Sequence, residues 1–278
     1  MHNEYSEWLP TVLMVAKKAA SSIMEFYQQK DVKKFQTRIK ADFSPVTSAD
    51  MSAHHIIAEE LLSFTPNIPL ISEEGMEIPF KERALWSRYW LVDPLDGTKE
   101  FIEGTGEFSV NIALIENHTP VLGVVVAPVF EEAYWAVQGQ PAYYQKGNSN
   151  PKRMRVNTDL QPSIKVAVSR RHAVNHPALA IFLKQMRTLY EGKATLEFIH
   201  CGSALKICLV ALGKADLYPR FGVTGEWDTA AGQCILEAAG GRLCDLSGNS
   251  LKYNLKKSLM NTGFIAIGVN ELNNIFCG

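Results

Sequence analysis

The sequence lacks an excess of charge of either sign. Its 28 lysines and arginines stand against 29 aspartates and glutamates, which gives a formal net charge of -1 over 278 residues. A protein that wraps nucleic acid normally carries a basic excess, so this balance argues against that class. The sequence also lacks an apolar run long enough to cross a bilayer, and acidic residues stand near its start where an export signal needs basic ones. We therefore expect a cytoplasmic protein without a transmembrane segment.

Cysteine is scarce, and its five occurrences include no CxxC motif. Scattered thiols in odd number favour a reducing compartment over a disulfide framework, and we expect all five to be small buried apolar side chains. Internal repeats and low-complexity tracts are also absent. With 46% hydrophobic residues, the chain can bury a substantial core in one large domain or two ordinary ones.

Hydrophobic periodicity predicts a mixture of helices and strands. Apolar residues every three or four positions predict an amphipathic helix over residues 4–29, and Ser48 or Asp50 is expected to cap a second helix that ends near Phe64. Further patterns predict strands over 68–72, 89–93, 108–115, 121–128, 131–137, 164–169, 195–200 and 263–269, and helices over 203–213 and 228–241.

The stretch 138–153 is rich in glycine, proline and asparagine, which is typical of a boundary. We expect an N-terminal half over 1–145 that carries most metal ligands. The second half, 146–278, would carry Asp228 and the residues that select the substrate. Two mixed α/β halves of this kind commonly hold a site in the cleft between them.

The segment WLVDPLDGTKEF (90–101) ends an apolar strand in two aspartates. Pro94 pushes Asp93 into an extended conformation, and the turn that follows lets Asp93, Asp96 and the Leu95 carbonyl face one point. Carboxylates held close without a counter-charge have raised pKa values and destabilise the fold. A hard divalent cation with oxygen ligands removes this penalty, so the segment predicts a Mg2+ site.

Gly97 and Thr98 begin a short turn directly after these aspartates. Backbone N–H groups at such a turn can bind a phosphate oxygen, and metal carboxylates beside an anion site suit metal-assisted hydrolysis of a phosphate ester. The plain alternative for Asp96–Gly97 is a capping aspartate in a common turn.

Two other acidic positions fit the same centre. Glu73 follows a predicted strand as Asp93 does, although a Glu-Glu pair is more often a solvated turn. Asp228 stands at the expected N-cap of a helix rich in small residues, and helix capping alone is its alternative role.

Four motifs taken together resemble the inositol monophosphatase-like superfamily: PVTSAD (45–50), SEE (72–74), DPLDGT (93–98) and WDTAAG (227–232). They stand in the family's order and span nearly the whole chain. The resemblance implies a layered αβαβα fold, classed as α+β. It also implies a lithium-sensitive phosphatase that uses two or three Mg2+ ions and acts on a small phosphorylated molecule.

The resemblance also implies roles for individual residues. Asp50 and Thr98 would orient and deprotonate the attacking water, with Thr47 positioning Asp50, and the Gly97–Thr98 amides would cradle the phosphate. The expected metal ligands are Glu73, Asp93, the Leu95 carbonyl, Asp96 and Asp228, and Glu73, Leu95, Asp96 and Asp228 would also border the substrate. Asp93 as a phosphorylated nucleophile is a weaker alternative, because it stands within a set of metal ligands.

Within this superfamily, DGTKEF (96–101), GSALK (202–206) and DLYPR (216–220) are most similar to bacterial 3'(2'),5'-bisphosphate nucleotidases. Those enzymes convert adenosine 3',5'-bisphosphate (PAP), a by-product of sulfate assimilation, into AMP. They are described at the cytoplasmic face of the inner membrane; this sequence supplies no anchor, so any such association here would be peripheral.

A bisphosphorylated nucleotide carries a second phosphate away from the metals. Lys206 and Arg220 are the expected partners of this phosphate, and Ser203 could add a hydroxyl contact. Their alternatives are surface cations and a helix cap. An inositol-1-phosphate or sugar phosphatase with the same metal site is the alternative enzyme, and a non-catalytic metal or nucleotide sensor is the alternative class. Either a monomer or a homodimer is compatible with the sequence.

Overall fold

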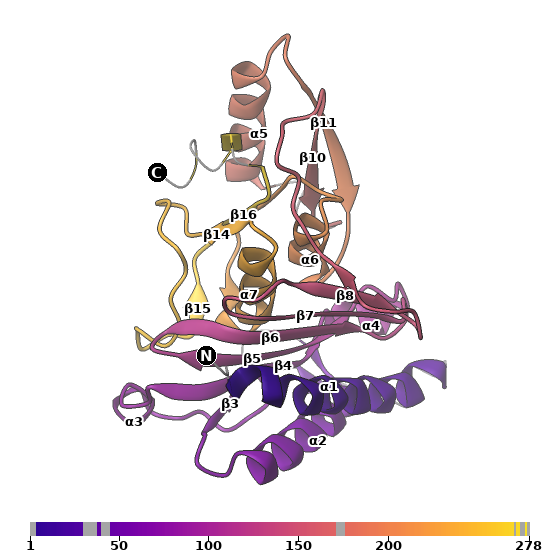
Figure 1. Cartoon of the computed structure of the whole chain (residues 1–278), viewed down its shortest axis with the longest axis vertical. Coiled ribbons are helices and arrows are strands. Elements are labelled where there is room, and N and C mark those ends of the chain that lie inside the picture. The colour runs from indigo at the N-terminus through magenta and orange to yellow at the C-terminus, as the bar shows by residue number, and fades with distance from the viewer. Residues whose placement is uncertain are drawn as a thin grey trace.

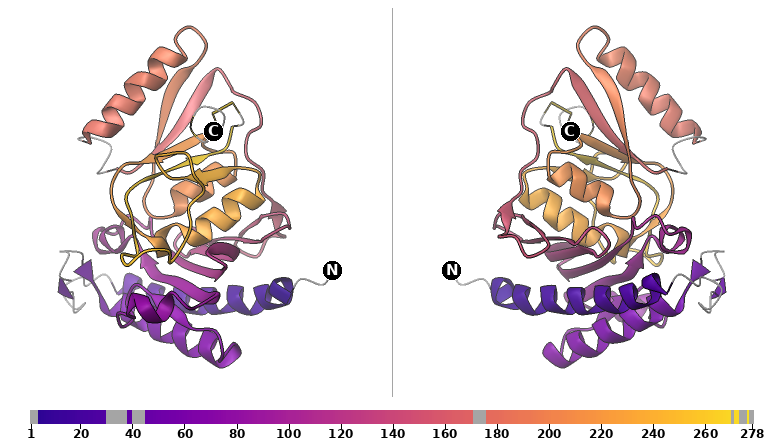
Figure 2. Two further views of the ribbon diagram at one scale, coloured as in Figure 1. Left: turned by 90° about the vertical axis from the view of Figure 1, so that its left-hand side faces the viewer. Right: turned by 90° about the vertical axis from the view of Figure 1, so that its right-hand side faces the viewer.

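The computed structural model describes residues 4–29, 38–39, 45–170, 176–269, 271–272 and 276. These residues form five layers, from α1 and α2 through a seven-stranded sheet, the pair α6 and α7, and a five-stranded sheet to α5 (Figure 1). The side views place α1 and α2 at one end of the molecule and α5 at the other (Figure 2). The expected αβαβα fold is confirmed.

The first sheet has the order β3-β4-β5-β6-β7-β8-β9. Only β3 and β4 pair in parallel, and the other neighbours are antiparallel. The central strands are buried over almost their whole length, which explains their continuous apolar runs. The strands are β3 (Leu70–Ser72), β4 (Arg88–Asp96), β5 (Ser109–Glu116), β6 (Thr119–Ala127), β7 (Glu132–Val137), β8 (Tyr143–Lys146) and β9 (Lys152–Arg153).

Helices α1 (Glu4–Gln28) and α2 (Ser48–Phe64) cover the outer face of this sheet. The apolar stripe of α1 is buried as its periodicity predicts. The expected cap of α2 is wrong, because Thr47 is the N-cap residue and its hydroxyl accepts a hydrogen bond from the Ala49 N–H. Asp50 instead occupies the third helical position and completes a capping box.

The second sheet has the order β11-β10-β12-β16-β14. Helix α5 packs on its outer face, and α6 and α7 fill the space between the two sheets. The elements are β10 (Ser163–Val168), α5 (Pro177–Leu189), β11 (Thr195–His200), α6 (Leu205–Ala211), β12 (Leu217–Arg220), α7 (Ala230–Ala238), β14 (Arg242–Cys244) and β16 (Phe264–Ile267).

Short elements connect these layers. A 3-10 turn, η2, precedes α7, and β13 pairs with β15 beside it. The pair β1 and β2 precedes α2. These elements are β1 (Arg38–Ile39), β2 (Pro45–Val46), α3 (Phe80–Arg83), α4 (Thr98–Glu103), β13 (Thr224–Gly225), η2 (Glu226–Asp228) and β15 (Met260–Asn261).

The first sheet ends at Arg153 and the second begins at Ser163. The division into halves near residue 145 stays a prediction. None of the helices in the described ranges is long and apolar enough to cross a membrane.

The expectation that the cysteines are unpaired thiols holds for some of them. Cys201, Cys208 and Cys234 are free thiols. Cys244 is disulfide-bonded, so the expectation that every cysteine is unpaired is wrong for this residue.

Candidate active site

Three carboxylates from separate elements meet at one edge of the first sheet. Glu73 follows β3, Asp93 lies within β4, and Asp228 ends η2. One oxygen from each lies within 4.8 Å of the others. The parallel pairing of β3 with β4 brings Glu73 and Asp93 to the same edge, and the Glu73 N–H extends the pairing by donating to the Val92 carbonyl at 3.1 Å.

Asp228 reaches this edge from the second half of the chain, 146–278. It is the last residue of η2 and its carboxylate accepts a hydrogen bond of 2.9 Å from the Gly225 N–H. The expectation that Asp228 caps the following helix is wrong, since Thr229 is the N-cap residue of α7. The carboxylate is therefore available to the cluster.

Burial and mutual repulsion act on this cluster together. Burial, and then the charges of Glu73 and Asp96, raise the pKa of Asp93 well above its ordinary value. Burial, and then the charges of Asp96 and Glu73, also raise the pKa of Asp228 well above its ordinary value. Several buried carboxylates at this spacing are destabilising unless a cation or protons neutralise them, and an all-oxygen donor set fits Mg2+. The residues present thus fit a hard divalent cation.

Asp96 lies beside these three carboxylates and faces the second half of the chain. Its Oδ2 accepts hydrogen bonds from the Ala204 N–H and, at 3.4 Å, from the Asn111 side chain. Burial raises its pKa, while the nearby Lys206 ammonium acts in the opposite direction. Asp96 therefore couples to the cluster electrostatically without belonging to the group within 4.8 Å.

The pair Asp50 and Thr98 is in direct contact. The Thr98 hydroxyl lies 3.0 Å from Asp50 Oδ1 and 3.2 Å from the Leu95 carbonyl oxygen. Thr47 donates to Asp50 Oδ2 from its N–H at 2.8 Å and from its hydroxyl at 2.6 Å. Burial raises the pKa of Asp50, and these hydrogen bonds oppose that rise. A fixed, buried carboxylate with a raised pKa is suited to accept a proton.

Gly97 lets the chain turn between Asp96 and α4. Its φ of 95° is left-handed, and a Cβ here would lie 3.0 Å from the Glu107 carbonyl oxygen. Only glycine fits both constraints without strain.

Lys206, Arg220 and Ser203 line a cavity of about 140 Å3 together with Asp96 and Asp228. Lys206 is buried rather than a surface cation. Its ammonium donates to the Ser203 carbonyl at 2.7 Å and lies 5.2 Å from the centre of the Tyr218 ring. The Ser203 hydroxyl lies 2.7 Å from that of Ser109 in the first half.

Thr224, which no sequence pattern singled out, lines the same cavity. Its hydroxyl and the Arg220 Nε are buried without a hydrogen-bond partner among the described residues. No motif marks Thr224, because its position at the cavity depends on how β13 folds. A larger cavity, of about 600 Å3, lies on the other side of the carboxylates and is lined by Glu73, Trp227 and Met260 among others.

The model of the inositol monophosphatase family matches residues 4–274 of this sequence. The chain belongs to the inositol monophosphatase family. It is 45% identical over 256 residues to the 3'(2'),5'-bisphosphate nucleotidase CysQ of Salmonella typhimurium, with 92% of this chain and 98% of the relative covered. It is 44% identical over 259 residues to the protein of the same name from Escherichia coli K12, with the same coverage.

Solved structures agree with the family assignment. The crystal structure of CysQ from Bacteroides thetaiotaomicron, a bacterial member of the family, superposes with a TM-score of 0.80 at 38% identity, covering 94% of this chain and 96% of that one. The extragenic suppressor protein suhB from Bartonella henselae superposes with a TM-score of 0.76 at 27% identity, covering 96% and 95%. Membership in a metal-dependent family agrees with the acidic cluster.

Proposed function

We propose that this chain is a Mg2+-dependent 3'(2'),5'-bisphosphate nucleotidase. It hydrolyses the 3'-phosphate of PAP to give AMP and inorganic phosphate, as part of PAP recycling in sulfur assimilation. The observation that carries the proposal is the convergence of Glu73, Asp93 and Asp228 within 4.8 Å of one another in a chain 45% identical to a protein named for this activity.

Glu73, Asp93, the Leu95 carbonyl, Asp96 and Asp228 would hold two or three Mg2+ ions. When bound, Mg2+ lowers the pKa of a coordinated water and neutralises charge on the phosphate. The first half, residues 1–145, would thus supply most of the ligands. The second half, 146–278, would supply Asp228 and the cavity that selects the substrate.

Asp50 and Thr98 would move the proton. The Thr98 hydroxyl donates to Asp50, so its oxygen keeps a lone pair that can accept a hydrogen bond from the attacking water. The water proton would pass to Thr98 while the Thr98 proton passes to Asp50, and the water oxygen would bond to phosphorus. The bond from phosphorus to the ribose 3'-oxygen breaks, and this oxygen takes up a proton from solvent to give AMP. The Gly97–Thr98 amides would hold the phosphate oxygens during this step.

Lys206 and Arg220 support a substrate with a second phosphate. They place two cations in the cavity that also contains Asp96 and Asp228. A monophosphate such as inositol 1-phosphate has no group for both cations to bind. An inositol or sugar phosphatase remains the alternative that shares the metal site.

The metal site is tested by Asp93→Asn and Asp228→Asn. Each variant should lose about a thousandfold or more in kcat, because several kcal/mol of transition-state stabilisation depends on the bound metal. The melting temperature in chelator should stay equal or rise, since each change removes a repelling charge. Full turnover by either variant would contradict the proposed site.

A further inference from the structure

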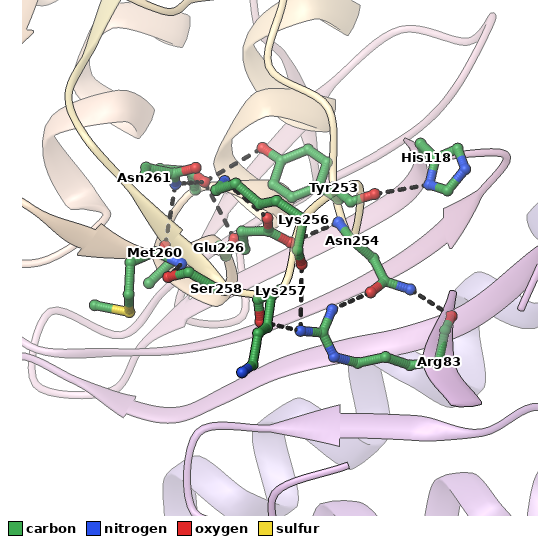
Figure 3. A network of polar contacts seen from close by, with 12 residues as sticks. Arg83, His118, Glu226, Tyr253, Asn254, Lys256, Lys257, Ser258, Met260 and Asn261 are labelled. Carbon is green, nitrogen blue, oxygen red and sulfur yellow. Dashed lines mark hydrogen bonds and ion pairs between the residues drawn. The ribbon is translucent and has the colours of Figure 1, made fainter. Parts of the chain in front are cut away.

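Arg83, the last residue of α3, has no part in the proposed reaction, yet its side chain is buried. Its guanidinium binds acceptors in several directions (Figure 3). Nε donates to the Ile78 carbonyl at 3.3 Å, and the two terminal nitrogens donate to Asn254 Oδ1 and to the backbone carbonyls of Lys256 and Lys257. A planar fork of this kind fixes the relative positions of everything it binds.

The first of these contacts leads to Glu73. Ile78 lies in the irregular loop between β3 and α3, which begins with Glu73. The bond from Arg83 to Ile78 closes this loop onto α3. Arg83 thereby restrains the chain that carries Glu73.

The other contacts lead to Asp228 through residues 254–261. The Asn254 N–H and the Lys256 ammonium bind the two oxygens of Glu226 at 2.7 and 3.3 Å, and the Glu226 N–H donates to the Leu259 carbonyl at 2.8 Å. Glu226 is fully buried and opens the same 3-10 turn that Asp228 ends.

The same segment also holds the residue before that turn. Met260 pairs with Gly225 between β15 and β13, and the Asn261 side chain donates to the Gly225 carbonyl at 3.3 Å. Gly225 in turn donates to the Asp228 carboxylate. Residues 254–261 therefore fix Gly225 and Glu226, the two residues that orient Asp228.

We infer that Arg83 is a positioning residue that sets the separation of Glu73 and Asp228, two ligands that come from opposite halves of the chain. Its rigid guanidinium binds both the loop that carries Glu73 and residues 254–261, which hold the segment that carries Asp228. The inference rests on the proposed metal site. Groups that orient metal ligands typically change metal affinity or activity by about 10- to 100-fold when they are replaced.

The test is the dissociation constant for Mg2+ in Arg83→Lys, measured by titration calorimetry on metal-free protein without substrate. Lysine keeps the charge, but its single ammonium nitrogen on a flexible stem does not reproduce the planar fork whose separate nitrogens bind Ile78, Asn254 and Lys257. We expect binding about 10-fold weaker or more. The matched control is Arg88→Lys, since Arg88 is another arginine of the first half, but it is only half-buried and pairs with Glu4 and Glu116. The control should bind Mg2+ as the wild type does.

Unchanged Mg2+ affinity in Arg83→Lys, with or without a lower melting temperature, would overturn the inference while the metal site stands. A wild type that binds no Mg2+ would instead refute the site itself. If Arg83→Lys fails to fold, Asn254→Gly replaces it. Glycine tolerates the φ of 58° at this position but removes both side-chain bonds to Arg83, so the same loss of affinity is expected.

Discussion

The Thr98 hydroxyl is the smallest group on which the proposed proton transfer depends. It bridges Asp50 and the Leu95 carbonyl, and so links the proposed base to the strand that carries Asp93. Replacing the hydroxyl with a methyl group keeps the shape of the side chain and removes the hydrogen bonds on which the relay depends.

Thr98→Val should therefore lower kcat by about 100- to 10,000-fold, the usual contribution of positioned acid–base catalysis. Steady-state kinetics at saturating Mg2+ measure the effect. The control is Thr105→Val. Thr105 lies exposed just after α4, and the partners of its hydroxyl among the described residues are the nearby backbone groups of Glu100 and Glu107. A kcat for Thr98→Val equal to that of the control would remove Thr98 from the mechanism.

The acidic residues of the site were predictable from the sequence because their motifs are local. Asp93 comes directly after the apolar run of its strand, and the structure brings it together with Glu73 and Asp228 as expected. Arg83 and Glu226 carry no such signal. Their partners lie in residues 254–261, and for Arg83 the sequence separation is about 171 positions, so only the folded chain reveals their contacts.

At the scale of elements, the turn at Gly97 joins α4 to the strand β4, which carries the proposed metal ligands Asp93 and Asp96. Two constraints act there, a left-handed backbone and close contact with the Glu107 carbonyl. Gly104, at the other end of α4, has a similar φ of 72° but open space around its Cβ position.

This contrast gives a prediction for Gly97→Ala and Gly104→Ala. Both should lower the free energy of unfolding by about 1–2 kcal/mol, the penalty for a left-handed alanine. Gly97→Ala should lose more than Gly104→Ala, since the new Cβ also displaces Glu107, and it alone should reduce kcat. Urea denaturation and kinetics measure both effects; equal losses of stability with unchanged kcat would show that the close contact is unimportant.

The strands β4 to β7 of the first sheet were predictable because burial on both faces leaves long apolar runs. The strands β8 and β9 were not predicted, since they lie in the stretch 138–153 that was expected to be a boundary. Helix α5 was not predicted, although Leu179, Phe182 and Met186 follow helical spacing. Its N-cap residue, His176, makes no capping bond, so the usual start signal is missing. The start of α2 was misplaced for a different reason: Thr47, Ser48 and Asp50 are all good capping residues, and only the hydrogen bonds show which one caps.

At the scale of the whole molecule, repelling carboxylates from both halves share one site. In the metal-free protein, burial and neighbouring carboxylates raise the pKa of Asp93 and Asp228 well above the ordinary value of 3.8. The native state then binds more protons than the unfolded chain. This contribution to stability is fully present below about pH 4 and is lost as the pH rises through the raised values.

Saturating Mg2+ should accordingly raise the melting temperature more at pH 8 than at pH 5, because it replaces the protons that the site loses. Scanning calorimetry with Mg2+ and with chelator at both pH values measures the difference. Asp93→Asn should reduce it, as one of the titrating groups is gone. Equal stabilisation by Mg2+ at the two pH values would contradict this account of the cluster.

The central claim is tested most directly by phosphate release, with Mg2+, from PAP, inositol 1-phosphate and fructose 1,6-bisphosphate at equal concentration. We predict that kcat/KM for PAP exceeds the other two by orders of magnitude. Over inositol 1-phosphate, the reason is the second phosphate of PAP, which Lys206 and Arg220 would bind. Preference for inositol 1-phosphate would contradict the nucleotidase assignment and leave the metal chemistry standing. No release from any of the three would contradict the enzyme itself and favour a non-catalytic sensor.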